Sequence, residues 1–113
     1  MNALTQTEFD WRLIGRLDDI PRQGARKVAA GDRIIAVFRT SDDRVFALED
    51  KCPHRQGPLS EGIVHGDCVT CPLHNWAISL ESGAAQGADE GRTARYPVRL
   101  DGRDVYLSLL PVA

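Results

Sequence analysis

The sequence predicts an all-β fold, built as an antiparallel β-sandwich or small barrel. Short runs of β-branched and aromatic residues recur along the chain, and polar turn residues separate them at regular intervals. Apolar residues do not recur at helical spacing over three clear turns anywhere in the sequence. The chain has 113 residues, a hydrophobic fraction of 42% and a charged fraction of 27%, which are typical of one globular domain spanning 1–113.

Four strands are expected in the first half of the chain, over 9–14, 25–30, 33–39 and 44–48. A turn ending at Pro21 follows the first strand, and Gly31 ends the second. The strand at 33–39 has the strongest signal, because its interior is apolar and rich in β-branched residues. The polar turn that follows it predicts a hairpin with the strand at 44–48.

The second half of the chain predicts strands over 69–70, 76–80, 96–100 and 105–109. Asp101 and Gly102 lie between the last two strands, and an Asp-Gly pair between alternating apolar residues is a strong hairpin signal. The segment 83–95 is rich in Gly, Ala and polar residues. We therefore expect a loop there, with at most one helical turn.

The charge balance of the chain excludes some classes of partner. The net charge is −2, with 14 basic and 16 acidic residues, and nucleic-acid binding calls for a clustered basic excess. No apolar run approaches the ~20 residues of a membrane span. The N-terminus lacks the basic and then apolar pattern of a signal peptide. We therefore expect a cytoplasmic protein with no nucleic-acid partner and no membrane partner.

The cysteines and histidines of the chain gather in one stretch. They are Cys52, His54, His65, Cys68, Cys71 and His74. An odd number of cysteines in a chain without an export signal is poor material for a disulfide framework. Four of these residues form two mixed pairs, Cys52-Pro53-His54 and Cys71-Pro72-Leu73-His74. This arrangement predicts a metal site.

Two loops that each donate one thiolate and one imidazole suit a 2Fe–2S cluster of the Rieske type. In such a centre two cysteines bind one iron and two histidines bind the other. Pro53 and Pro72 stiffen the two loops by fixing a backbone dihedral angle. Structural zinc is an alternative, because Cys₂His₂ is a normal zinc shell, although zinc fingers usually place both histidines on a helix. Burial of the four residues for packing alone is the other alternative.

Two further residues of the stretch could be ligands. Cys68 could act as a substitute ligand or a redox thiol, but its place before the second pair favours a small apolar strand residue. His65 precedes a Gly-Asp turn, and this place favours a surface histidine rather than a ligand. We also expect Leu59 and Leu73 to form an apolar collar for docking near the loop tips.

The two cysteine-histidine pairs resemble the Rieske ferredoxin family. Longer runs resemble the small subunit of assimilatory NAD(P)H-dependent nitrite reductase, at 57–66, 69–76, 86–91 and 96–98. The resemblance implies an all-β fold in which a small cluster-binding subdomain, about residues 50–80, is inserted in a base of antiparallel strands. It implies a 2Fe–2S cluster of the Rieske type, with the ligands Cys52, His54, Cys71 and His74.

The resemblance also implies a function and a partner. The chain would transfer electrons as the small subunit, and a large subunit with FAD, a 4Fe–4S cluster and sirohaem would reduce nitrite to ammonium with NADH or NADPH. Respiratory Rieske proteins carry a disulfide between their two loops, and Gly57 and Leu73 occupy those positions here. We therefore expect a potential at the low end of the Rieske range of about −150 to +300 mV. Two alternatives remain: a free ferredoxin for an aromatic-ring dioxygenase, and a structural or regulatory subunit.

Overall fold

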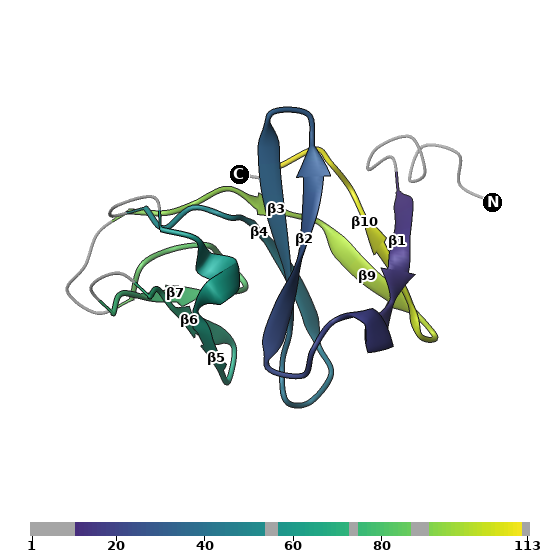
Figure 1. Ribbon diagram of the computed structural model, residues 1–113, viewed down its shortest axis with the longest axis horizontal. Coiled ribbons are helices and arrows are strands. Elements are labelled where there is room, and N and C mark those ends of the chain that lie inside the picture. Colours follow the sequence, from purple (N-terminus) through teal and green to yellow (C-terminus); the bar gives the residue numbers. More distant parts are fainter. Residues whose placement is uncertain (1–10, 54–56, 73–74, 87–90, 112–113) are drawn as a thin grey trace.

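The computed structural model describes residues 11–53, 57–72, 75–86 and 91–111 (Figure 1). Its strands are β1 (Arg12–Arg16), β2 (Gly24–Ala30), β3 (Arg33–Arg39), β4 (Val45–Glu49), β5 (Ile63–His65), β6 (Cys68–Thr70), β7 (Ala77–Ser79), β8 (Arg95–Tyr96), β9 (Val98–Asp101) and β10 (Asp104–Leu107). Two 3₁₀ turns complete the described elements, η1 (Leu17–Asp19) and η2 (Leu59–Glu61).

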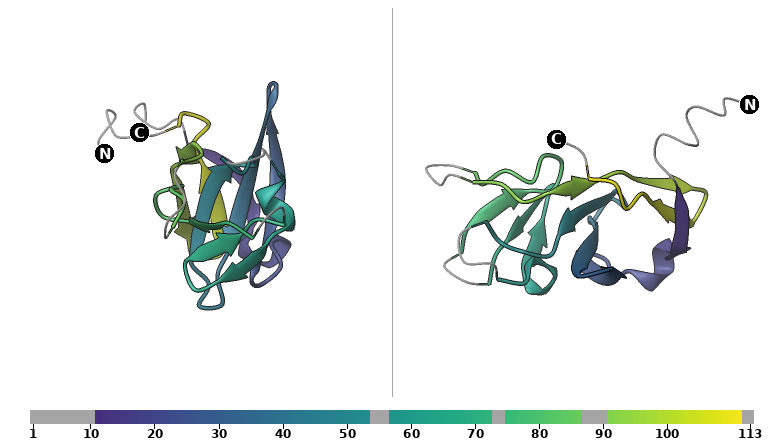
Figure 2. Two further views of the ribbon diagram at one scale, coloured as in Figure 1. Left: turned by 90° about the vertical axis from the view of Figure 1, so that its left-hand side faces the viewer. Right: turned by 90° about the horizontal axis from the view of Figure 1, so that it is seen from above.

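The strands form three antiparallel sheets. Their orders are β1-β10-β9, β2-β3-β4-β8 and β5-β6-β7. The sheet β2-β3-β4-β8 lies in the middle of the molecule, with β5–β7 on one side of it and β1, β9 and β10 on the other (Figures 1 and 2). The predicted all-β, antiparallel fold is therefore confirmed.

Strand β3 separates two hydrophobic cores. Ile35 and Val37 pack with Leu107 and Tyr96 in the first core, which joins the central sheet to the β1-β10-β9 sheet. Ala36 and Phe38, which alternate with them along the strand, belong to the second core instead. Its buried members are Ala36, Phe38, Leu48, Cys52, Leu59, Val64, Val69, Cys71, Ile78 and Leu80. Alternate side chains of a strand point to opposite faces, so a strand buried on both faces has a continuous apolar run.

Most predicted strands agree with the structure to within a few residues, and β3 has the predicted bounds. One predicted strand is wrong, and one observed strand has no predicted counterpart. The single strand expected over 96–100 is divided into β8 and β9 at Pro97, which has no backbone N–H to donate to a sheet. Strand β5 was not predicted, because three residues are too few for an alternating pattern to appear. Residues 9–10 of the first predicted strand lie outside the described residues.

The segment after β7 is a loop, as predicted, but its described part contains no helical turn. Isolated bridges join Ala85 to Ile78 and Ala84 to Arg92. Gly83 has a φ of +76°, and a Cβ at this position would lie 2.4 Å from the carbonyl oxygen of Thr93. The loop therefore doubles back closely on itself, and only glycine fits at its start. No helix in the described part of the chain has the length and apolar character needed to cross a membrane.

Candidate cluster site

Cys52 and Cys71 begin two loops that are closed in the same way. Cys52 follows β4, and its N–H donates to the carbonyl oxygen of Gly57 at 2.8 Å. Cys71 follows β6, and its N–H donates to the carbonyl oxygen of Trp76 at 2.7 Å. Each cysteine is therefore held at the base of a loop that ends five residues later.

Both cysteine side chains are fully buried, at 0% exposure, and both belong to the second core. Neither forms a disulfide with another described cysteine. Two sulfur donors at the bases of neighbouring loops, with apolar side chains around them, suit an iron–sulfur cluster, because a hydrophobic shell limits the access of solvent to the metal. His54 and His74 lie outside the described residues, as does Leu73.

Cys68 has different surroundings from Cys52 and Cys71. Cys68 lies on β6 opposite Ser79 and His65, and is only partly buried. Burial raises the pKa of its thiol, and the charge of the neighbouring Asp67 and a hydrogen bond to that carboxylate raise it further. The thiol therefore stays protonated at neutral pH, as is usual for a small, partly buried strand residue. The interpretation of Cys68 as a strand residue is confirmed.

His65 is exposed, as predicted, but it ends β5 rather than lying in the turn. Its Nε2 lies 2.7 Å from the hydroxyl oxygen of Thr70, within hydrogen-bond distance. Thr70 directly precedes Cys71, so the hydrogen bond braces the strand that leads into the second loop.

A hydrogen-bonded pair that the sequence did not reveal fixes the entrance of the first loop. The carboxylate of Asp50 accepts two hydrogen bonds from Ser60, one from its N–H and one from its hydroxyl, both at 2.7 Å. Asp50 lies two residues before Cys52, and Ser60 lies on η2 after the loop has ended. The pair therefore ties both ends of the first loop together, which local sequence signals do not predict.

Described residues from a third part of the chain lie against the first loop and against the strands beside both loops. The hydroxyl of Thr93 donates to the carbonyl oxygen of Glu49 at 3.2 Å, three residues before Cys52. The N–H of Gln86 donates to the carbonyl oxygen of Ala77 at 2.8 Å, just after the second loop. Gly91 has a φ of +127°, and a Cβ there would lie 3.1 Å from the Cβ of Pro53. Gly91 is thus packed against Pro53 in the first loop, while Gln86 and Thr93 hold the residues just after the second loop and just before the first.

A family comparison decides what this site is. The model of the Rieske [2Fe-2S] domain matches residues 10–97 of the chain. The chain belongs to the Rieske 2Fe–2S family. Its cofactor is therefore a Rieske-type 2Fe–2S cluster, as predicted, and this Rieske protein is an electron-transfer protein.

Curated relatives of this Rieske protein include ferredoxins of dioxygenases. It is 38% identical over 99 residues to the anthranilate 1,2-dioxygenase ferredoxin subunit of Burkholderia cepacia, a match that covers 86% of this chain and 91% of the relative. It is 33% identical to the biphenyl dioxygenase ferredoxin subunit of Pseudomonas sp. (strain KKS102), covering 79% of this chain and 83% of that one.

Two of the similar solved structures come from different redox systems. One is a complex of reduced oxygenase and oxidized ferredoxin in carbazole 1,9a-dioxygenase, with a TM-score of 0.80, 27% identity and coverage of 91% of this chain and 96% of the other. Another is described as a nitrite reductase NADPH (small subunit) oxidoreductase protein, with a TM-score of 0.76, 27% identity and coverage of 86% and 96%. The Rieske protein thus resembles both kinds of redox protein.

The structure corrects one prediction about the surface near the loops. Leu59 has 0% exposure and packs in the second core, so it cannot form an apolar docking collar. As the first residue of η2, it turns into the core while Ser60 bonds to Asp50. An apolar residue after a Gly-Pro pair reads equally well as surface or core in the sequence, and only the tertiary packing distinguishes the two.

Proposed function

We propose that Cys52, His54, Cys71 and His74 hold the cluster. The two buried cysteines at the bases of similarly closed loops support this set, and the sequence puts one histidine inside each of these loops. Four side chains then fill the four terminal sites of a 2Fe–2S cluster. When bound, the cluster supplies one-electron transfer.

We further propose that the chain works as the small subunit of an assimilatory NAD(P)H-dependent nitrite reductase. One observation carries the proposal: the two longest runs that resemble that subunit lie at the cluster site. The run 57–66 begins at the end of the first loop and contains η2 and β5, and the run 69–76 begins within β6 and contains Cys71. The similar structure described as a nitrite reductase small subunit supports it. Nitrite chemistry then belongs to the large subunit, and this chain supplies a path for electrons and a surface for docking.

Reconstitution with the large subunit tests this function. The large subunit is purified alone, and NAD(P)H-dependent nitrite reduction is measured with and without the cluster-loaded chain. We expect activity to depend on the chain, and His54→Ala to lose both the cluster signal in electron paramagnetic resonance and the activity. Full activity with a cluster-free variant would instead support the structural or regulatory alternative.

A specific observation favours a second candidate, a ferredoxin that serves an aromatic-ring dioxygenase. The 38% identical relative has this role by name and is matched over 91% of its length. The two candidates differ in partner alone. A chain that reduces a dioxygenase terminal component at catalytic rates, but forms no complex with the nitrite reductase large subunit, would establish the second candidate and exclude the first.

A further inference from the structure

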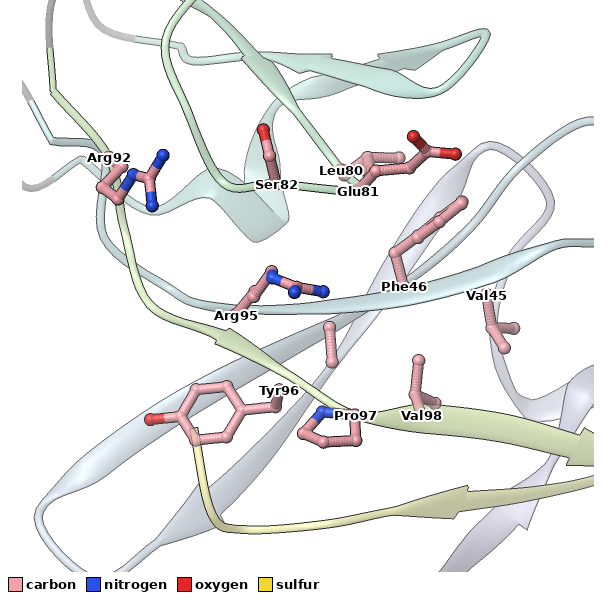
Figure 3. Close-up of a pocket in the computed structure, with 11 residues that line it drawn as sticks. Val45, Phe46, Leu80, Glu81, Ser82, Arg92, Arg95, Tyr96, Pro97 and Val98 are labelled. Carbon is pink, nitrogen blue, oxygen red and sulfur yellow. The ribbon is translucent and has the colours of Figure 1, made fainter. Parts of the chain in front are cut away.

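An open groove lies beside the cluster site, on a flank of the molecule. It has a volume of about 660 Å³, and its walls come from β4, from β8 and the start of β9, and from the turn after β7 (Figure 3). Arg92 and Arg95 lie at one end of the groove, with Ser82 near them, while Phe46 and Val98 lie at the other end. The groove therefore has a cationic end and a largely apolar end, and the carboxylate of Glu81 lies on the same side of the groove as Phe46 (Figure 3).

The two arginines have no carboxylate partner among the described residues. Other arginines of the chain do pair with aspartates, namely Arg22, Arg26, Arg39, Arg44 and Arg103. Arg92 and Arg95 are both exposed to solvent. They remain without a carboxylate partner in the described structure although the chain has 16 acidic and only 14 basic residues. Two exposed guanidinium groups at the same end of a groove are suited to bind an acidic segment, since the planar fork of each matches the geometry of a carboxylate.

The groove continues toward the first loop. Arg92 also lines a smaller depression of about 280 Å³, whose other lining residues include Cys52 and Pro53. A molecule held at the cationic end would thus lie beside the loop that carries a cluster ligand. Electron transfer needs such proximity, whereas a binding site elsewhere on the surface would not provide it.

We propose that this groove docks a redox partner protein through a segment that carries a carboxylate next to an apolar side chain. The carboxylate binds Arg92 and Arg95, and the apolar side chain packs against Phe46 and Val98. The mixed lining favours such a segment over a free inorganic anion, for which the apolar end would have no use. The proposal rests on the electron-transfer role of the chain, but it does not depend on which partner is the native one.

Charge reversal tests the groove in the loaded protein. Arg92→Glu and Arg95→Glu, singly and together, are compared with Lys27→Glu, which changes the charge by as much as each single reversal and lies on β2, at the opposite edge of the sheet that contains β8. Reduction of the chain by the NADH-reduced nitrite reductase large subunit is followed by stopped-flow spectroscopy at low and high salt. We expect the double reversal to slow the reaction about tenfold at low salt, and high salt to remove the difference.

Control variants make the result specific. Lys27→Glu is expected to stay within about twofold of the wild type, and the double Arg→Lys variant to recover most of the rate, because long-range steering depends on charge. The cluster signal in electron paramagnetic resonance must be unchanged in every variant. The proposal is overturned if the double reversal leaves the rate unchanged, or if Lys27→Glu slows the reaction as much.

A peptide probe separates this inference from the proposed function. The peptide Ac-Glu-Leu-Glu-Phe-NH₂ and its glutamine counterpart are titrated into the loaded chain, and amide shifts are followed by NMR. We expect the glutamate peptide alone to shift groove amides such as those of Ser82 and Val98, and the shifts to vanish in the double reversal. If the peptide binds in this way but the large subunit fails to reduce the chain, the nitrite reductase function is rejected and the groove proposal stands. If the large subunit reduces the wild type and the double reversal at the same rate, and the peptide causes no shifts, the groove proposal is rejected and the nitrite reductase function stands.

Discussion

The three cysteines of the chain have two kinds of surroundings. Cys52 and Cys71 are fully buried at the bases of two loops, while Cys68 is partly buried on β6, beside the carboxylate of Asp67. Burial and the charge of Asp67 raise the pKa of the Cys68 thiol. Position in the fold, and not residue type, separates the two proposed ligands from the strand residue.

Serine substitutions test this distinction. We expect Cys52→Ser and Cys71→Ser to lose most of the bound iron and the cluster spectrum, because each removes one of the four proposed ligands. Cys68→Ser is the matched control, lies three residues from Cys71 in the sequence, and should retain full iron content. Iron per chain and electron paramagnetic resonance of the reduced protein give the readout. Equal loss in all three variants would contradict the ligand assignment.

Gly62 offers a prediction about close backbone approach. A Cβ at this position would lie 2.2 Å from the carbonyl oxygen of Thr70, the residue before Cys71. We expect Gly62→Ala to lower the free energy of unfolding by about 3 kcal/mol, measured by denaturant titration, because the backbone must move to relieve the clash. Gly31→Ala is the control: its Cβ meets nothing within 4 Å, and only its φ of +66° is strained. It should cost about 1 kcal/mol, and equal costs would contradict the clash.

At the scale of elements, one buried arginine joins the start of the chain to a hairpin. Arg39 ends β3, is 8% exposed, and donates to the carbonyl oxygens of Leu17 and Ile20 at 3.3 and 3.0 Å. Its Nε also donates to the carboxylate of Asp43 at 2.9 Å, in the turn before β4. The arginine thereby fixes η1 against the hairpin between β3 and β4.

This contact predicts how stability depends on pH. The hydrogen bond from Arg39 lowers the pKa of Asp43, with nearby arginine charges adding to the effect. A carboxyl group whose pKa is lower in the folded state stabilises the fold above its unfolded pKa, and that contribution is lost as the pH falls through the folded pKa. We expect Asp43→Asn to reduce stability at pH 7 but not at pH 2, so that its stability changes less with pH. Unfolding followed by urea titration across this range measures it, and an unchanged pH dependence would contradict the contact.

Elements that depend on local chemistry could be predicted from the sequence, and those that depend on distant contacts could not. The apolar run of β3 and the Asp-Gly turn before β10 contain their own signals. Strand β5 has only three residues and exists because it pairs with β6. The Asp50–Ser60 contact joins residues ten positions apart on either side of the first loop. The cysteine-histidine pairs were visible because each lies within a few residues of sequence.

At the scale of the whole molecule, β3 links the base of the fold to the cluster site. Val37 faces the first core and Phe38 faces the second, which contains Cys52 and Cys71. Val37 and Phe38 are both fully buried and adjacent in the sequence, so β3 separates the core of the base from the core of the site. A change on one face of β3 should act on one core only.

Two neighbouring substitutions test this division. Phe38→Ala removes a large side chain from the second core and should cost about 3–5 kcal/mol and reduce the retained cluster. Val37→Ala removes less volume from the first core and should cost about 2 kcal/mol while cluster content stays normal. Chemical unfolding measures stability, and the ratio of visible to ultraviolet absorbance measures cluster content. Equal cluster loss in the two variants would contradict the division.

The burial of both cysteines has a consequence for how the protein matures. A scaffold protein that delivers a preassembled cluster must bring it into contact with two sulfur-bearing side chains that have no exposed surface. Delivery to these two proposed ligands therefore requires a chain in which the packing around Cys52 and Cys71 has opened locally. The rate of loading then follows the population of locally opened molecules. The same closure that slows loading also slows loss, so a chain that has acquired its cluster should keep it through many rounds of electron transfer.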